Sequence, residues 1–443
     1  MTITLGKIAL LTKEKIDMVS YSLYLFILVF APPIVPYPHL LLTIFSFLML
    51  ATAYKRKVWI VLKRSGIYNW ILASSLLAMY TVCIPLPISM FCNDIVNTTH
   101  YISIINRYGV LMVTVSVCLT YLLCKTDKDG YNYEFLLESL INAGLIEGIC
   151  AALAFLFPGV KNIFIFFMKE FSESYLYSNT WYITVRSYGF ASTLVDVFGL
   201  GIGLIAGISF FYGVTKKKKY IIKSIIIAIA TLLNSRTGLI VYLLAIIISF
   251  LFMINGKNIK RILTVLCAIV FLSVCGLELL KIMSTNEYTE GWFSSGINSI
   301  TSFFDGTKSN NGGSDAMSLL FQNKFWKWPS FPRILVGTGH SLYLAQGYSH
   351  SDVGYVNEVW VFGIFGCAIL YGEIVKLCRA MTLKANKDIF KFSSVFLLVA
   401  YFFFNIKGGA LGYNPGAVAM FVVVFITIYF NNKNTENKTE SGV

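Results

Sequence analysis

The sequence predicts an all-helical protein that crosses a membrane many times. Two observations on composition support this prediction: 56% of the 443 residues are hydrophobic and only 13% are charged, whereas soluble domains average roughly 25% charged residues. A third observation is that apolar runs of membrane-spanning length recur from residue 18 to residue 431. We therefore expect one membrane domain over residues 1–443 and no separate soluble domain.

The apolar runs divide into about twelve expected membrane helices. Four prolines between residues 32 and 38 end the first run, and no small-residue cleavage site follows it, so we interpret it as a retained helix. The expected spans are residues 18–35, 38–54, 67–88, 102–124, 134–157, 187–213, 220–234, 237–254, 262–281, 353–375, 392–406 and 414–431. An even number of spans places both termini on one side. Residues 282–352 form the one large loop, and residues 432–443 form a tail.

Charge orients the expected spans. Most of the 36 Lys and Arg residues fall in loops on the side of the termini, in clusters such as 55–57, 216–219, 257–261 and 376–391. By the positive-inside rule the termini and the tail are cytoplasmic, and the large loop faces outward. The net charge of +14 is then largely a signal of topology. Lysines beside helix ends also suit anionic lipid headgroups, so we expect membrane lipids as partners and no nucleic acid.

Arginine departs from this bias, because Arg107, Arg186, Arg236 and Arg333 fall on the outward side. Arg236 lies between two apolar runs, where a permanent charge needs a water-facing cavity or an anionic partner. A guanidinium can donate two parallel hydrogen bonds to phosphate oxygens. Interfacial snorkelling or a structural ion pair is the alternative for each of the four. These arginines are therefore candidates for binding an anion.

Acidic residues mark two further features. Glu138, Glu147, Asp196 and Glu373 lie within expected spans, where they need partners and either line a cavity or lock helix packing. The junction between the large loop and the span at 353–375 carries three titratable residues close together in sequence: His350, Asp352 and Glu358. For Asp352 the alternative is a helix cap stabilised by the helix dipole.

Glycines occur before and after this acidic segment. Gly337 and Gly339, next to His340, permit a close backbone approach to a ligand or a helix. Gly363 and Gly366 would let another helix approach. The chain has four histidines, and no pair has metal-ligand spacing, so we expect no metal site.

Together these segments resemble the O-antigen polymerase (Wzy) family and its relatives, the O-antigen ligases and related capsule polymerases. The resemblance rests on Arg186-Ser-Tyr-Gly189, Asn234-Ser-Arg-Thr-Gly238, Gly337-Thr-Gly339, Ser351-Asp-Val-Gly-Tyr355 and Gly363-Ile-Phe-Gly366. In the ligase branch a histidine precedes the Gly-x-x-Gly pattern at a fixed spacing. Here Asp352 stands at that position and His350 is two residues out of register. This departure favours a polymerase.

The resemblance implies a multi-pass glycosyltransferase of the bacterial inner membrane, working without metal or cofactor, with its site open to the periplasm. It would polymerise undecaprenyl-diphosphate-linked oligosaccharide repeat units in lipopolysaccharide biosynthesis. The growing glycan would pass from its lipid diphosphate to a hydroxyl of an incoming lipid-linked repeat. Besides these lipid-linked oligosaccharides, a chain-length regulator is a candidate partner.

The resemblance also implies roles for the candidate residues. Arg236 and Arg186 would bind the diphosphate, with Arg333 and Arg107 as helpers. Asp352 is the first choice for the base that activates the acceptor hydroxyl, His350 the second and Glu358 the third. Contact with the glycan, or shaping of the loop, would fall to Gly337, Gly339, His340 and Tyr355.

Two alternative functions share most of these features. An O-antigen ligase would transfer finished polymer to the lipid A core. A lipid-linked oligosaccharide flippase would also have about twelve helices and outward arginines, but it should show two similar halves, as transporters often do. The sequence shows no such repeat.

Overall fold

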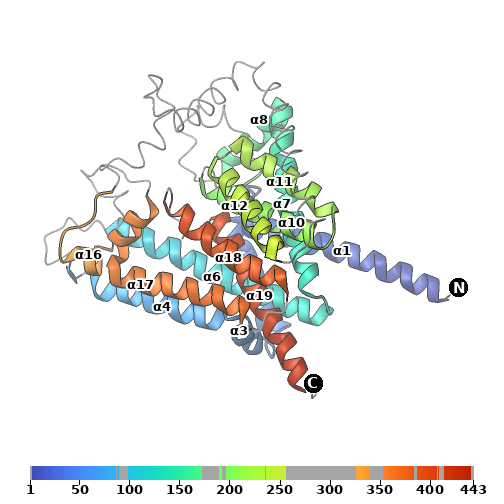
Figure 1. The fold of residues 1–443 in the computed structure, drawn as a ribbon, viewed down its shortest axis with the longest axis horizontal. Helices are drawn as coiled ribbons and strands as arrows, with labels where there is room; N and C mark the ends of the chain where they lie inside the picture. Colours follow the sequence, from blue (N-terminus) through green and yellow to red (C-terminus); the bar gives the residue numbers. More distant parts are fainter. Residues whose placement is uncertain are drawn as a thin grey trace.

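A computed structural model of the chain describes residues 2–85, 87–88, 98–171, 189–191, 196–234, 236–255, 326–339, 353–383, 387–406, 408 and 414–440. Every regular element within these residues is a helix, as the sequence predicts (Figure 1). The helices are α1 (Thr2–Phe30), α2 (Pro38–Thr52), α3 (Val58–Ser65), α4 (Ile67–Cys83), α6 (Thr98–Asp129), α7 (Tyr133–Leu156), α8 (Pro158–Phe171), α10 (Asp196–Thr215), α11 (Lys219–Asn234), α12 (Arg236–Asn255), α16 (Arg333–Val336), α17 (Gly354–Thr382), α18 (Asp388–Phe404) and α19 (Pro415–Glu440).

A helix lies within each expected span that the described residues cover, and the span at 262–281 falls outside them. Two expected spans are helical over only part of their length: the first helix ends at Phe30, and the helix expected from residue 187 begins at Asp196, after the non-helical residues 189–191. Short helices also form where the sequence predicted loops, namely α3, α8 and α16. The expected tail begins as a direct continuation of α19, which ends at Glu440.

Five described helices are long and apolar enough to cross a membrane: Tyr108–Asp129, Tyr133–Leu156, Val197–Thr215, Gly354–Thr382 and Pro415–Glu436. The pair α3 and α4 adds a sixth candidate if the two helices, bent by 76° at Gly66, form one span. The protein is therefore a helical membrane protein. The count of about twelve spans and their sidedness stay predictions.

The centre of the molecule is formed by α10 and α19. Buried residues make up 89% of the most apolar part of α10 and 94% of that of α19, and a helix that is apolar on all sides belongs in a core. Glycines let neighbours approach α10 closely. A Cβ on Gly203 would lie 2.5 Å from the Gly238 carbonyl oxygen of α12, and one on Gly201 would lie 2.7 Å from the backbone of Pro415 in α19. The starts of α10, α12 and α19 therefore meet at one end of the bundle.

Cationic side chains gather at the opposite end. Lys57 and Lys433 bind Asp127 at 2.9 and 2.5 Å, which joins the loop before α3, the end of α19 and the end of α6. Near the turn between α10 and α11, Lys217 binds Glu138 of α7 at 2.9 Å, and this hydrogen bond raises the pKa of Lys217. In Figure 1, α3 and α16 lie at opposite ends of the helices α4 and α17. The described lysines of residues 55–57 and 216–219 thus lie near the end of α6 and the start of α7. The cluster 257–261 lies outside the described residues, and the side of the membrane that this end faces stays a prediction.

Candidate functional site

The helix α17 is broken at Gly363, whose φ of 63° and ψ of 179° are not helical. A break leaves backbone carbonyls of the preceding turn without helical partners, and within a membrane these carbonyls must find others. The segment Gly337–Gly339 supplies them. Thr338 N donates to Trp360 O at 2.7 Å, and Gly339 N donates to Val361 O at 3.0 Å. The Thr338 hydroxyl donates a further hydrogen bond to Trp360 O, at 2.8 Å.

Gly337 and Gly363 contact each other through their backbones. A Cβ on Gly337 would lie 2.5 Å from Val361 O, and a Cβ on Gly363 would lie 2.4 Å from Gly337 N. Both residues also have a positive φ, which favours glycine. The sequence predicted a close approach at each glycine separately. The structure shows that the two glycine segments are each other's partners.

Glu358 lies in the first half of α17 and is 3% exposed. Its two carboxylate oxygens accept hydrogen bonds from Asn405 Nδ2 at 3.2 and 3.1 Å, and one of them also accepts from the Tyr371 hydroxyl. Tyr371 lies 13 residues further along the same helix, a rise of about 20 Å in an unbroken α-helix. The break at Gly363 is therefore what brings the two side chains together.

The same cluster fixes the start of α17 to the end of α18. Tyr355 N donates to Asn405 O at 3.2 Å, and the Tyr355 hydroxyl donates to Phe402 O at 2.6 Å. A Cβ on Gly354 would lie 2.3 Å from Gly408 O. The sequence analysis expected Tyr355 to contact the glycan or shape the loop. In the structure its side chain is half-buried in the contact between α17 and α18. Sequence reasoning missed Asn405, although an amide at the end of the apolar run 392–406 was a signal for it.

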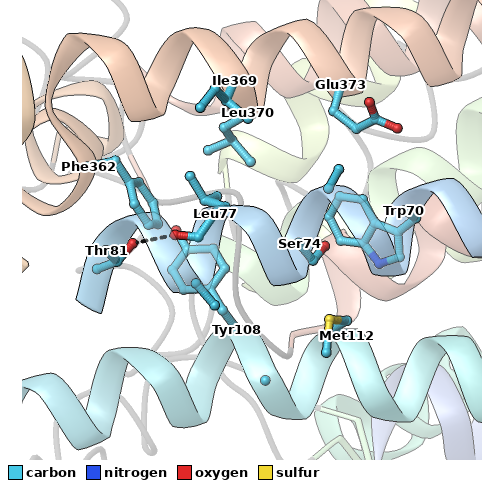
Figure 2. Close-up of a pocket in the computed structure, with 13 residues that line it drawn as sticks. Trp70, Ser74, Leu77, Thr81, Tyr108, Met112, Phe362, Ile369, Leu370 and Glu373 are labelled. Atoms are coloured by element: carbon cyan, nitrogen blue, oxygen red, sulfur yellow. Dashed lines mark hydrogen bonds between the residues drawn. The ribbon is translucent and has the colours of Figure 1, made fainter. Parts of the chain in front are cut away.

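A groove of about 200 Å³ lies beside the broken helix, between α4, α6 and α17 (Figure 2). Its walls are almost wholly apolar, with Leu77 from α4, Met112 from α6 and Leu370 from α17. The Thr81 hydroxyl is occupied by a 2.7 Å hydrogen bond to Leu77 O. The residue at the end of the groove in α17 is Phe362, next to the break at Gly363. The groove therefore suits a long apolar chain.

The groove ends close to α16. The Tyr80 hydroxyl of α4 donates to Val336 O, the last residue of α16, at 3.0 Å. Arg333 is the first residue of the same short helix. Of the four candidate arginines, Arg333 is thus the one that the described residues place near both the groove and the broken helix.

The other candidate arginines are described in part or not at all. Arg236 opens α12, and a single residue separates it from the end of α11 at Asn234, as expected for a very short turn. Arg107 lies within α6. The side chains of Arg236 and Arg107 are outside the described part of the chain. The remaining candidates, Arg186, His340, His350 and Asp352, lie outside the described residues altogether.

Glu147 of α7 is completely buried and binds the short segment that follows the Arg186 motif. One carboxylate oxygen accepts a hydrogen bond from Phe190 N at 3.1 Å. A Cβ on Gly189 would lie 2.2 Å from the other oxygen, so a larger residue there would displace the Glu147 carboxylate. From the sequence, Glu147 could either line a cavity or stabilise helix packing. The structure assigns the Glu147 carboxylate to holding a backbone segment in place.

The other acidic residues expected within spans have partners of a different kind. Glu138 binds Lys217, and Glu373 binds Lys376 at 3.1 Å. The side chain of Asp196 is outside the described part of the chain. The Lys217–Glu138 pair lies at the surface of the bundle, because Lys217 is more than half exposed. Glu373 is 9% exposed and also lines the groove between α4, α6 and α17, so the cavity-lining alternative applies to it.

Comparison of the chain with protein-family models, with curated proteins and with solved structures finds no match.

Proposed function

We propose that the protein polymerises oligosaccharide repeat units carried on undecaprenyl diphosphate, at the periplasmic face of a bacterial inner membrane. One observation supports the proposal most directly. The segment Gly337–Gly339 packs against the break in α17 at Gly363 and donates hydrogen bonds to the carbonyls before it. Two segments of the polymerase-like pattern, far apart in sequence, are here parts of one substructure. Non-helical backbone at membrane depth is tolerated where it is buried in protein or lines a cavity, and broken helices are typical of membrane binding sites.

The chemistry needs positive charge and a base. As the glycosidic bond breaks, the diphosphate leaves with the bonding electrons, and fixed guanidinium groups stabilise the developing charge without protonating it. We assign this role to Arg236 and Arg186, helped by Arg333 and Arg107. The acceptor hydroxyl attacks the anomeric carbon and gives its proton to a base within hydrogen-bond reach. Asp352 is our first choice for this base and His350 the second.

Glu358 takes a different role in this proposal. Its carboxylate is enclosed and already accepts hydrogen bonds from Asn405 and Tyr371. A base must reach the hydroxyl it deprotonates, so we assign Glu358 to holding the two halves of α17 together.

The groove between α4, α6 and α17 would take part of the polyprenyl chain. An apolar chain lying along it from Leu370 to Phe362 would end close to α16. The diphosphate would then meet Arg333 near the broken helix. In this arrangement the lysine-rich end of the bundle is cytoplasmic, about twelve spans cross the membrane, and both termini are cytoplasmic.

Lipopolysaccharide from a strain lacking the protein tests the proposal. A single repeat unit on the lipid A core, without a ladder, is the expected result. Polymer that accumulates on the carrier lipid but is absent from the core would instead indicate a ligase. Loss of every periplasmic repeat unit would indicate a flippase. Restoration of the ladder by the plasmid-borne gene is the control.

A further inference from the structure

A second groove lies at the lysine-rich end of the bundle, away from α16. It has a volume of about 340 Å³ and is formed by α2, α3, α4 and α6. Its walls include Leu50, Leu62, Ile71 and Val117, and Lys55 lines it as well. Apolar walls with one cation are the chemistry of a site for an amphiphile.

Among the described residues, no carboxylate forms a salt bridge with the two cations at this groove, Lys55 and Arg56. Within the described residues, three carboxylates at this end are paired with other cations: Asp127 with Lys57 and Lys433, Asp129 with Lys125, and Glu436 with Arg64. A fourth, Asp17, accepts a hydrogen bond from the Tyr131 hydroxyl. Lys55 and Arg56 are exposed and form no salt bridge with any of the described residues. Two adjacent cations therefore remain to meet an anion.

The helix α3 begins at Val58, directly after these cations. It is bent by 76° from α4 and so runs across the direction of the neighbouring span. Trp59 is 53% exposed and lies 5.2 Å from the ring of Tyr68, with Lys63 over its face at 4.8 Å. Exposed Trp and Tyr beside lysine are typical of the membrane interface. The helix that contributes Val58 and Leu62 to the groove thus also carries side chains typical of a membrane interface.

We propose that this groove binds one anionic phospholipid, with an acyl chain against the apolar walls and the phosphate at Lys55 and Arg56. Charge complementarity favours an anionic headgroup over a zwitterionic one, because each surface cation adds to the attraction of an anionic lipid. The site is separate from the groove assigned to the polyprenyl chain and does not depend on the proposed enzymatic function.

The test is native mass spectrometry of the purified full-length protein, titrated with phosphatidylglycerol or with phosphatidylcholine. We expect tight retention of one phosphatidylglycerol, and affinity lower by about fivefold for each of Lys55→Gln and Arg56→Gln. Lys218→Gln, at an exposed lysine near the α10–α11 turn, should change nothing. Equal retention of the two lipids by the unaltered protein would overturn the proposal.

A second pair of variants tests the groove itself. Ala51 lines it and is exposed, so Ala51→Trp should fill it without disturbing the fold and should remove the retained phosphatidylglycerol. Leu76→Trp, at a residue of α4 that is 55% exposed and does not line the groove, is the matched control. Unchanged retention in Ala51→Trp would place the lipid on the outer surface and exclude the groove as its site.

Discussion

At the scale of single residues, the buried polar groups hold backbone and helices in place. Asn405 bonds both oxygens of Glu358, and Glu147 receives the backbone N–H of Phe190. A buried carboxylate that loses a partner keeps its cost of desolvation. Substitution of one of these hydrogen-bond partners should therefore lower the stability of the protein markedly, although the contacts are few.

Asn405→Ala should destabilise the protein by about 2 kcal/mol, because the buried carboxylate of Glu358 loses the hydrogen bonds that Asn405 donates to its two oxygens. Thermal unfolding in detergent would measure the loss. In Asn405→Ala combined with Glu358→Gln, the neutral amide needs less compensation, so the loss should be smaller than the sum of the single losses. Strict additivity would show that the two side chains are not coupled.

Asp352→Asn and Arg236→Lys should each abolish the lipopolysaccharide ladder while the protein still inserts into the membrane. The first change removes the proposed base, and the second removes the bidentate grip on phosphate. Glu358→Gln should retain laddering, because we assign its carboxylate to packing. A full ladder with Asp352→Asn or Arg236→Lys would show that the substituted residue has no part in the mechanism. Loss of the ladder in a stably inserted Glu358→Gln variant would make Glu358 a candidate for the base again.

At the scale of elements, the two halves of α17 depend on a segment from elsewhere in the chain. Thr338 and Gly339 satisfy carbonyls that the break exposes, and Gly337 fits only because it lacks a side chain. The short helix α16 and the broken α17 are therefore one structural unit.

Gly363→Ala and Gly337→Ala should each cost about 3 kcal/mol or more, since the added Cβ would lie within 2.5 Å of backbone atoms and φ is positive at both residues. Gly372→Ala in the second half of α17 is the control, because nothing lies within 4 Å of its added Cβ. That change should be neutral or stabilise the protein by up to about 1 kcal/mol. Equal melting temperatures for all three variants would contradict this account of the break.

At the scale of the whole molecule, the charge pattern and the fold agree on two chemically different ends. One carries the lysine-rich turns at α3 and between α10 and α11. The other carries α16, the starts of α12 and α17, and the end of α18. The two ends should therefore face opposite sides of the membrane.

Cysteine labelling in intact cells tests this orientation. Ser330→Cys lies one turn before Arg333 and is exposed, so a membrane-impermeant maleimide should label it from the periplasm. Lys218→Cys, also exposed, should react only after the cells are lysed. Cys83, which is free and exposed, and Cys92, which lies in the expected outward loop before the span at 102–124, are first replaced by Ser in both variants. The reverse labelling pattern would invert the topology.

The sequence alone determined the helical class and the positions of most helices, because a run of apolar residues is a local property that the membrane environment demands. It also indicated which glycine segments matter. Only the tertiary structure showed that Gly337 meets Gly363 and that Glu358 meets Asn405. The break lies inside the expected span at 353–375, where the local pattern predicts a continuous helix. A non-helical residue there is stable only because a distant segment supplies its hydrogen bonds, and such pairing depends on the folded arrangement of the whole chain.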